Sequence, residues 1–322
     1  MTPTIHLLCA VHNGARFLPA LLESLAEQTH REWILWMLDD HSRDDSAAVM
    51  AVAASRDPRV RVVSPAPAPL GAVGAFARLW ELAPPEARYL AFADQDDVWL
   101  PHKLATSLAA LQRAEGTEST APPRPALVHT DLEVVGPALE PMAPSYWRYA
   151  GVVPEPATFR RVAAQNVVTG CTVLVNGALR QVVGSIPPGA TMHDAWVASV
   201  AAALGQVVTL YEPTVRYRQH GGNTLGARQA GSQSPWHQRF ARIWRALTHQ
   251  APIRRQLAAA AAQAKLLAAQ YGDRLGAEDR DFLHALAQIP RMPWWDRKRA
   301  VARYYLHPEH ERIRRLGVLW RA

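Results

Sequence analysis

The sequence predicts an α/β protein built on a Rossmann-like, mostly parallel sheet flanked by helices, with a helical appendage at the C-terminus. Over about the first 110 residues, short apolar runs alternate with segments of helical periodicity, which is typical of a doubly wound sheet. The 322 residues are 49% apolar and can bury one large core. Beyond a Gly/Ser/Gln-rich connector at residues 226–235, the composition shifts to Ala, Leu and Arg without a strand signal.

The first four strands and helices follow from this alternation. The apolar run IHLLCAV (5–11) ends at HNG, and the leucines of residues 17–25 recur behind it at helical spacing, so a strand precedes a helix. We expect Ser42 to cap the second helix in a capping box with Asp45, and Pro101 to lie in the first turn of the fourth. The remaining strands are expected at 33–38, 59–63 and 88–93, and the helices at 42–54, 74–83 and 101–111.

The second half of the sheet is less regular. After the loop APPRPA (121–126), strands are predicted for LVHTDLEVV, GCTVLV and QVVTLY, at 127–135, 170–175 and 206–211, and a helix for 194–204. These elements fit a mixed continuation of the same sheet. We therefore expect a catalytic domain over residues 1–228 and a basic α-helical region over 229–322.

The cysteines and the hydropathy of the sequence indicate a cellular compartment. Cys9 and Cys171 both lie in apolar runs, which indicates buried thiols in a reducing compartment. No stretch has the roughly 18 to 20 apolar residues that a membrane-spanning helix needs, and the N-terminus lacks the basic region of a signal peptide. We therefore expect a cytoplasmic protein.

The net charge of +7 is unevenly distributed. Residues 231–322 carry 17 Lys and Arg against 7 Asp and Glu, whereas the first 230 residues carry 18 against 21. Two interpretations of the basic region stay open: helices resting on an anionic membrane surface, or helices packing on the catalytic domain with a solvated basic face. The membrane interpretation draws on arginines beside Trp294, Trp295, Tyr304, Tyr305 and Trp320. Because no nucleic-acid-binding module is recognisable, we expect no nucleic-acid partner.

Acidic residues follow two of the predicted strands. Asp39 and Asp40 follow the second strand, and Asp94, Asp96 and Asp97 follow the fourth. In an open parallel sheet, ligands bind at the carboxyl ends of the strands, so these carboxylates should share one cleft. Three carboxylates within four residues repel one another unless a cation screens them, and Asp-x-Asp spacing suits Mg²⁺ or Mn²⁺ with substrate phosphates.

Simpler explanations of these acids also exist. A solvated acidic loop is the alternative for residues 94–97, and turn or cap chemistry the alternative for Asp39 and Asp40. We expect Asp97 to be an acid at the start of a helix, where it favours the helix dipole. A glycine-rich phosphate cradle is absent, since Gly14 stands alone after the first strand, and a bound cation would have to neutralise phosphate instead.

Five segments between about residues 4 and 227 together resemble the family 2 glycosyltransferases with the GT-A fold, and among these the rhamnosyltransferase-type members that decorate bacterial surface polysaccharides. The segments are AVHNGARFLPALLESLAEQTHREWILWMLDDHSRDDS, FADQDDVWLPHKL, NVVTGCTVLVN, TMHDAW and YRQHGGNTLG. The resemblance implies inverting transfer of a sugar, such as L-rhamnose from a dTDP donor, to a glycan or lipid-linked acceptor, with Mg²⁺ or Mn²⁺ as cofactor.

The resemblance also implies a role for ten residues. The donor base would meet Asp40, with Asp39 beside it, in a pocket lined by Val11 and Asn13. Asp94 would face the ribose and the metal, and Asp96 and His220 would bind the metal. Arg216 and Arg218 would lie near the diphosphate. Asp194 would be the general base beside the acceptor.

Several of these side chains have a structural alternative. Asp194 could cap its helix, and Arg216 and Arg218 could form a solvated strand edge. His193 is expected to orient or pack beside Asp194. Trp99 and Trp196 could stack on sugar rings or belong to the aromatic core. His129 and Asp131 could contact the donor sugar or only end a strand.

Rival functions also share this chemistry. A metal-dependent nucleotidyltransferase or phosphohydrolase would use the same Asp-x-Asp pair, although the chain lacks the glycine-rich loop and the phosphoenzyme motif of those enzymes. A non-catalytic adaptor that binds the membrane surface would not need all of the acidic residues named above. The complete acidic set therefore favours the transferase.

Overall fold

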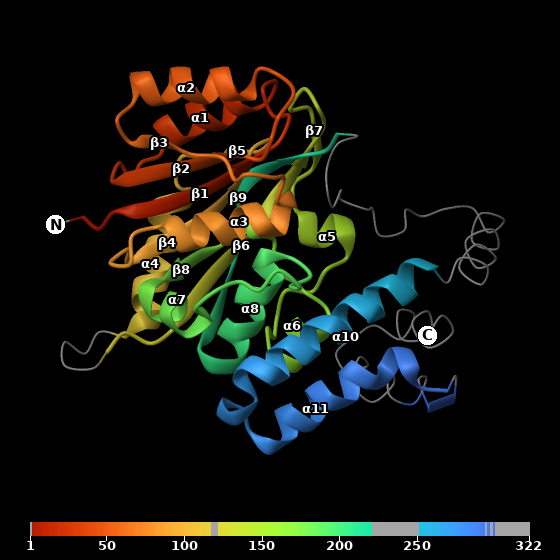
Figure 1. Ribbon diagram of the computed structural model, residues 1–322. Coiled ribbons are helices and arrows are strands. Elements are labelled where there is room, and N and C mark those ends of the chain that lie inside the picture. The colour runs from red at the N-terminus through yellow and green to blue at the C-terminus, as the bar shows by residue number, and fades with distance from the viewer. Residues whose placement is uncertain (1, 117–121, 221–250, 294, 297–298, 300–322) are drawn as a thin grey trace. The chain divides into compact units, whose positions relative to one another are not determined.

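The computed structural model of the chain describes residues 2–116, 122–220 and 251–299, apart from 294, 297 and 298 (Figure 1). The chain forms two compact units. The first comprises residues 1–157, 167–188 and 192–230, and the second residues 158–166, 189–191 and 231–322. The domain boundary expected after residue 228 lies outside the described residues. Among the described helices, none is long and apolar enough to cross a membrane.

The first unit is built on one nine-stranded sheet with the order β3-β2-β1-β4-β8-β6-β9-β5, and β7 pairs with β6. The pairs β1–β2, β1–β4, β2–β3 and β6–β9 are parallel, and the others are antiparallel. The predicted mixed, mostly parallel sheet is therefore confirmed. The strands are β1 Ile5–Val11, β2 Trp33–Asp39, β3 Val60–Val63, β4 Tyr89–Asp94, β5 Val98–Trp99, β6 Ala126–Val135, β7 Pro141–Ala143, β8 Leu174–Asn176 and β9 Gln206–Arg218.

Helices cover both faces of this sheet, as its apolar strands require. Alternate β1 residues, from Ile5 to Val11, join one core with apolar residues of α1, α2 and α4. On the other face, Phe92 of β4 packs against Phe76 and Trp80 of α3. The helices of the first unit are α1 Leu18–Ala26, α2 Ser46–Arg56, α3 Gly71–Leu82, α4 Lys103–Glu115, α5 Tyr146–Ala150, α7 Gly177–Val183 and α8 His193–Leu204, with a short 3₁₀ turn η1 at Gly170–Thr172.

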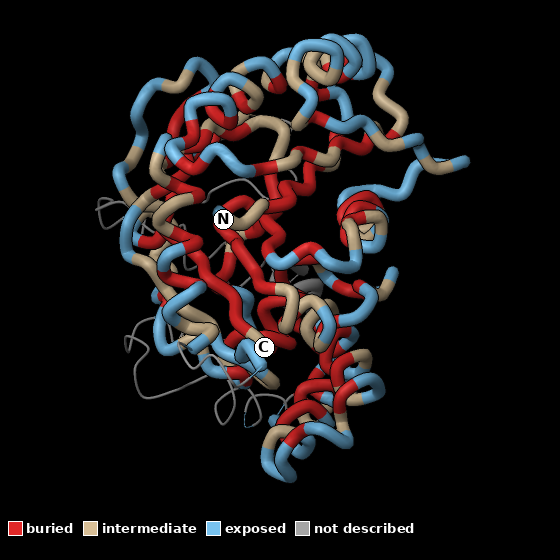
Figure 2. Tube along the Cα trace, turned by 90° about the vertical axis from the view of Figure 1, so that its left-hand side faces the viewer, coloured by how far each residue is buried: buried red, intermediate tan, exposed pale blue. Residues whose placement is uncertain are grey.

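The buried side chains agree with the predicted core. Figure 2 shows buried segments of the trace lying between exposed and intermediate ones. Cys9 and Cys171 are both buried free thiols. Trp99 and Trp196 are 1% and 0% exposed, which confirms the core assignment of both and excludes sugar stacking.

Several element predictions were wrong in detail. The second helix begins at Ser46 rather than Ser42, and the Ser42 hydroxyl instead accepts a hydrogen bond from the Asn13 amide at 2.9 Å. Ser42 thus holds the β1–α1 loop, and no capping box forms. The run GCTVLV begins with the turn η1 before the strand β8, and the strand predicted for 206–211 continues to Arg218.

The second unit is helical in its described part, as expected. It contains α6 Phe159–Ala164, α10 Ala251–Tyr271, α11 Ala277–Gln288 and the 3₁₀ turns η2 Gly272–Arg274 and η3 Ile289–Arg291. Phe159 packs edge-on against Phe282, and Arg160 pairs with Glu278 and Asp279 at 2.7 and 2.8 Å.

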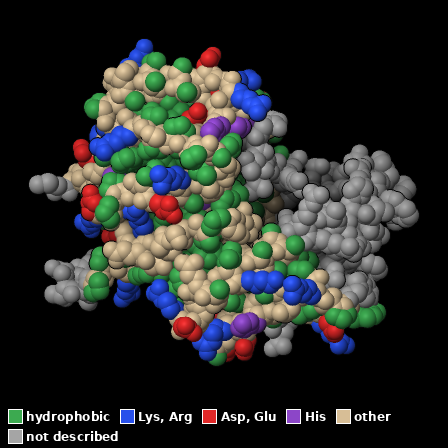
Figure 3. All heavy atoms as spheres, viewed as in Figure 1, with side chains coloured by type: hydrophobic (Ala, Val, Ile, Leu, Met, Phe, Trp, Pro, Cys, Tyr) green, Lys and Arg blue, Asp and Glu red, His purple; other side chains and the backbone are tan. Residues whose placement is uncertain are grey.

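Little of the expected membrane surface falls within the described part of the chain. Trp295 is 70% exposed, whereas Trp294, Tyr304, Tyr305 and Trp320 lie outside the described residues. On the face drawn in Figure 3, acidic and basic side chains are scattered among the others. Membrane contact therefore stays a prediction.

Candidate functional site

A pocket of about 470 Å³ opens at the carboxyl ends of β1, β2 and β4. Its walls come from those strand ends, the start of α3, the turn η1 and the start of α8. Five residues that the sequence singled out line it together: Val11, Asp40, Asp94, Asp96 and Asp194. The sheet edge thus assembles side chains that are up to 183 positions apart in the chain.

A second hollow of about 520 Å³ adjoins this pocket and shares His12 and Pro69 with it. Asn13 lies here, together with His41, Ser42 and Arg43. Asp39 lines neither cavity, and its carboxylate accepts a hydrogen bond from the Ser42 amide at 3.2 Å. Because they share two lining residues, the two hollows are neighbouring candidate surfaces for an extended ligand.

Asp40 fixes the start of α3. Its two carboxylate oxygens accept hydrogen bonds from the backbone amides of Leu70 and Gly71 at 2.7 and 2.8 Å. This contact explains why α3 begins at Gly71, three residues before the predicted start. The carboxylate keeps further lone pairs with which it can accept from a ligand.

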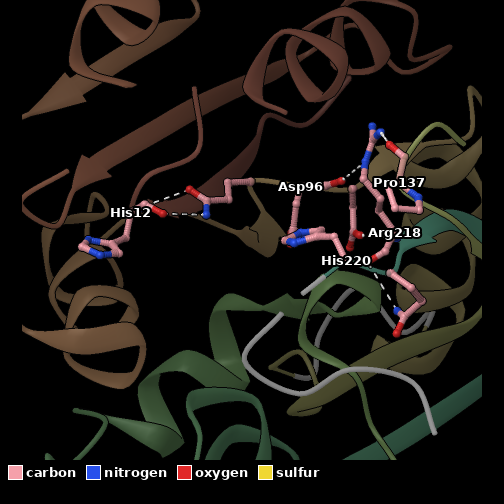
Figure 4. A network of polar contacts seen from close by, with 8 residues as sticks. His12, Asp96, Pro137, Arg218 and His220 are labelled. Carbon is pink, nitrogen blue, oxygen red and sulfur yellow. Dashed lines mark hydrogen bonds and ion pairs between the residues drawn. The ribbon is translucent and has the colours of Figure 1, made fainter. Parts of the chain in front are cut away.

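Gln95, the middle residue of the Asp-x-Asp motif, joins two loops of the site. Its side-chain oxygen accepts from the His12 amide at 2.9 Å, and its side-chain nitrogen donates to the His12 carbonyl at 3.0 Å (Figure 4). A Cβ on Gly14 would lie 2.2 Å from that side-chain oxygen, so a larger residue at position 14 would displace the Gln95 amide from this position. In the sequence, only the isolated glycine after the first strand indicates this contact.

We expect Gln95→Asn to misplace the two loops, because the shorter amide cannot reach both groups of His12. Nucleotide affinity measured by calorimetry should fall at least about fivefold, roughly the worth of one lost hydrogen bond. Gln95→Glu keeps the length but replaces the donor that faces the His12 carbonyl, and it should behave similarly. Wild-type affinity in both variants would show that the pairing with His12 does not position the site.

The acids after β4 lie close to one another and to a histidine. Asp96 Oδ2 lies 2.8 Å from His220 Nε2 (Figure 4). The His220 ring stacks on Phe17 with ring centroids 4.5 Å apart. Burial, with the charges of Asp96 and Asp194 nearby, raises the pKa of Asp94 to about 7. Carboxylate oxygens and an imidazole are a donor set that suits Mn²⁺ or Mg²⁺, and a cation here would relieve the repulsion among the acids.

Asp97 has a structural role that the sequence did not indicate. The residue is fully buried, and its Oδ1 accepts from the Arg218 amide at 3.1 Å, which ties β9 to the acidic segment. The next helix begins only at Lys103, so the assignment of Asp97 as a helix-start acid was wrong. The reason is the short strand β5, which intervenes between Asp97 and that helix.

Asp97 also belongs to a buried cluster. Ligand atoms of Asp94, Asp97 and Cys171 lie within 4.8 Å of one another. Burial, together with the neighbouring carboxylates, raises the pKa of the Cys171 thiol well above its usual range. A protonated, soft sulfur is a poor ligand for a hard cation, so the exposed side of Asp94 and Asp96 is the better metal site.

The two arginines of β9 do not line the pocket; Tyr217 between them does. Arg216 pairs with Glu133 at 3.3 Å on an exposed surface. Arg218 donates from Nε to the Asp96 carbonyl at 2.8 Å and from Nη1 to the Pro137 carbonyl at 2.7 Å (Figure 4). Arg218 therefore holds the backbone of the acidic segment at Asp96.

Asp194 lies in the first turn of α8 and lines the pocket. The N-cap position is Met192, and the Asp194 Oδ1 accepts from the adjacent Ala195 amide at 2.6 Å, so the N-cap alternative was wrong. Burial raises the pKa of Asp194 to about 6. A carboxylate with that pKa can accept a proton near neutral pH.

His129 and Asp131 are buried in the interior of β6. His129 Nε2 lies 2.9 Å from the Thr209 hydroxyl, and Asp131 accepts from Ser145 Oγ at 2.5 Å and from the Trp147 amide at 3.2 Å. Neither residue lines the pocket or ends a strand. Asp131 instead fixes the start of α5.

This mixed sheet, with acids at the end of its fourth strand, is a GT-A-type architecture. Two solved structures share it: S. aureus TarS in complex with UDP-GlcNAc (TM-score 0.52, 15% identity, covering 93% of this chain and 83% of that one) and GalNAc-T7 with UDP, GalNAc and Mn²⁺ (TM-score 0.54, 13% identity, 84% and 54%). At these identities the likeness concerns the fold alone.

Residues 8–124 match the family described as "Glycosyl transferase family 2". Similar curated proteins include an uncharacterized glycosyltransferase of Nostoc sp., with 32% identity over 112 residues, which are 34% of each chain. Another is the UDP-Glc:alpha-D-GlcNAc-diphosphoundecaprenol beta-1,3-glucosyltransferase WfgD of Escherichia coli, with 28% identity over 107 residues, covering 33% of this chain and 40% of that one. The match thus spans two fifths or less of these relatives.

Proposed function

We propose that the protein is an inverting, metal-dependent glycosyltransferase that transfers a sugar from a nucleotide-diphospho-sugar to a glycan or lipid-linked acceptor. One observation carries this proposal: a single pocket is lined by Asp40, Asp94, Asp96 and Asp194 together. The family of residues 8–124 supports the same reaction class.

The donor would lie along this pocket. The base would contact Asp40 and the neighbouring loop with Val11 and Asn13, and Asp39 would support that loop through Ser42. The diphosphate would lie by Asp94 and Asp96, which would hold Mg²⁺ or Mn²⁺ together with His220. Bound there, the cation would stabilise the negative charge that grows on the departing diphosphate.

The two arginines of β9 have different roles in this proposal. Arg218 would orient Asp96 through its backbone carbonyl and add positive charge behind the diphosphate. Arg216 lies on the exposed side with Glu133, so its predicted contact with the diphosphate requires the donor to extend beyond the pocket.

Asp194 would act as the general base. The acceptor hydroxyl attacks the anomeric carbon from the face opposite the diphosphate, and Asp194 accepts its proton during the attack. The C–O bond to the diphosphate breaks as the new glycosidic bond forms, so the anomeric configuration inverts. A second carboxylic acid is unnecessary, because the leaving diphosphate does not need protonation.

We also propose L-rhamnose from a dTDP donor as the transferred sugar, on the strength of the motif resemblance. The Escherichia coli relative points instead to a UDP-sugar, because it is named for UDP-glucose and an undecaprenol-linked acceptor; TarS, which shares only the fold, was solved with UDP-GlcNAc. The named acceptor supports a lipid-linked or surface-polysaccharide acceptor here, reached by peripheral contact at the cytoplasmic membrane face. Failure of the full chain to cosediment with anionic liposomes would contradict that contact.

A panel of nucleotide-sugars tests the proposed reaction. The wild-type protein is incubated with dTDP-rhamnose, UDP-glucose and UDP-GlcNAc, with Mn²⁺ or with EDTA, and the products are identified by mass spectrometry. We expect slow, Mn²⁺-dependent release of the nucleoside diphosphate from one donor. Release of a nucleoside monophosphate and sugar phosphate would indicate a phosphohydrolase, and no turnover of any donor would contradict the proposal.

A further inference from the structure

His193 is a buried polar side chain in the pocket wall, next to the proposed base. It is 2% exposed and lines the pocket from the first turn of α8. Its ring stacks on Phe76 with centroids 3.9 Å apart and meets Phe92 edge-on at 4.5 Å. These two aromatic rings fix the plane of the imidazole.

Neither ring nitrogen of His193 has a hydrogen-bond partner within the described part of the chain. A buried polar group without a partner costs about 1–3 kcal/mol, and more than about 90% of such groups in proteins are paired. A phenylalanine would fill the same aromatic cage without that cost. The imidazole is therefore better explained by a ligand that supplies the missing hydrogen bond than by packing.

The character of the side chain limits the ligand. Burial lowers the pKa of His193 to about 3, so the ring is neutral and offers one donor and one acceptor nitrogen. A neutral imidazole of this kind matches an uncharged hydroxyl group better than a phosphate. In the buried His129, by comparison, Nε2 lies 2.9 Å from the Thr209 hydroxyl and only Nδ1 has no partner among the described residues.

The position of His193 indicates which hydroxyl it meets. A Cβ on Gly170 would lie 3.0 Å from His193 Nε2 and 3.4 Å from Asp194 Oδ2, so both atoms border the space that this glycine leaves open. Asp94 and Asp96, the proposed diphosphate end, belong to the same pocket. Because inversion requires the anomeric carbon to lie between the departing diphosphate and the base, the donor sugar would occupy the space that His193 Nε2 and Asp194 Oδ2 border.

We propose that His193 binds a hydroxyl group of the donor sugar and so distinguishes a nucleotide-sugar from its free nucleotide. This inference rests on the proposed function. Its ligand class is a neutral pyranose hydroxyl, and His193 becomes a specificity-determining residue rather than only a neighbour of Asp194.

Calorimetry on His193→Phe tests the assignment, with UDP-GlcNAc, UDP-glucose and dTDP-rhamnose as probes and UDP and dTDP as sugar-free references, all with Mn²⁺. We expect the preferred nucleotide-sugar to bind at least about tenfold more weakly to the variant, the loss of a hydrogen bond worth about 1.4 kcal/mol. Binding of the free nucleotide should stay within twofold. The melting temperature should be unchanged or raised, because an unpaired buried polar group is removed.

Two further variants complete the experiment. His193→Gln keeps a donor and an acceptor and should recover part of the sugar-dependent affinity. His129→Phe removes a buried histidine away from the pocket and should leave it unchanged. Equal losses of nucleotide and nucleotide-sugar affinity in His193→Phe, no loss of either, or an effect on acceptor KM alone would each overturn the assignment. Wild-type protein that binds no nucleotide would overturn the proposed function as well.

Discussion

Replacement of Asp194 by Asn is expected to abolish sugar transfer while donor binding remains intact. The amide cannot accept the proton of the acceptor hydroxyl, and general bases contribute about 10²- to 10⁴-fold to turnover. We therefore expect kcat to fall at least about 100-fold in a transfer assay. The dissociation constant for the nucleotide-sugar should change less than about twofold, because the substitution conserves shape and the backbone contact to Ala195.

The same carboxylate should set the acidic limb of the pH profile. Because burial raises the pKa of Asp194 to about 6, the basic form is lost as pH falls through that value. Measured at saturating donor and Mn²⁺, kcat should fall tenfold per pH unit well below pH 6 and level off above it. Asp194→Asn should show no such limb, and near-normal turnover in that variant would remove Asp194 as the base.

Asp96→Ala is expected to eliminate the metal dependence of donor binding. With Mn²⁺, the wild type should bind the donor nucleotide much more tightly than with EDTA, because a cation held by the carboxylates would offset the negative charge of the diphosphate. In the variant, binding with Mn²⁺ should fall to the level seen with EDTA, a loss of at least about tenfold by calorimetry.

A matched control separates this effect from a general loss of negative charge. Asp45 is an exposed acid at the start of α2 that lines neither cavity. Asp45→Ala should retain the full Mn²⁺ dependence. Unchanged Mn²⁺-dependent affinity in Asp96→Ala would contradict the metal assignment.

Local periodicity predicted much of the fold. The strands and helices up to residue 115 lie within a few residues of their expected positions, because both sheet faces are buried and each strand appears as a short apolar run. The predictions of helix caps were wrong where contacts between loops determine the structure. Ser42 looks like a helix cap in sequence but serves the Asn13 amide, a contact over 29 positions that no local pattern reveals.

The candidate site could be predicted only in part. Asp40, Asp94 and Asp96 follow from their places at strand ends, whereas Asp194 was identified through the family motif. Gln95 was missed as a contact residue because amides seldom signal a role in sequence.

The orientation of β9 explains why the structure differs from the prediction that its two arginines line the site. Side chains alternate along a strand, so Arg216 and Arg218 share one face and Tyr217 takes the other. The arginines carry the charge that draws attention in the sequence, yet Tyr217 is the residue that lines the pocket. Which face turns inward depends on packing that one sequence does not show.

The central claim is that the acids after β4 form a metal-dependent nucleotide-sugar site. A crystal grown with Mn²⁺ and a nucleoside diphosphate, with diffraction collected at the manganese absorption edge, tests it most directly. We predict one strong anomalous peak in contact with the Asp96 and Asp94 carboxylates, with the diphosphate beside it and the base towards Asp40. A nucleotide bound elsewhere, or the absence of manganese from these two carboxylates while the nucleotide is bound, would contradict the claim.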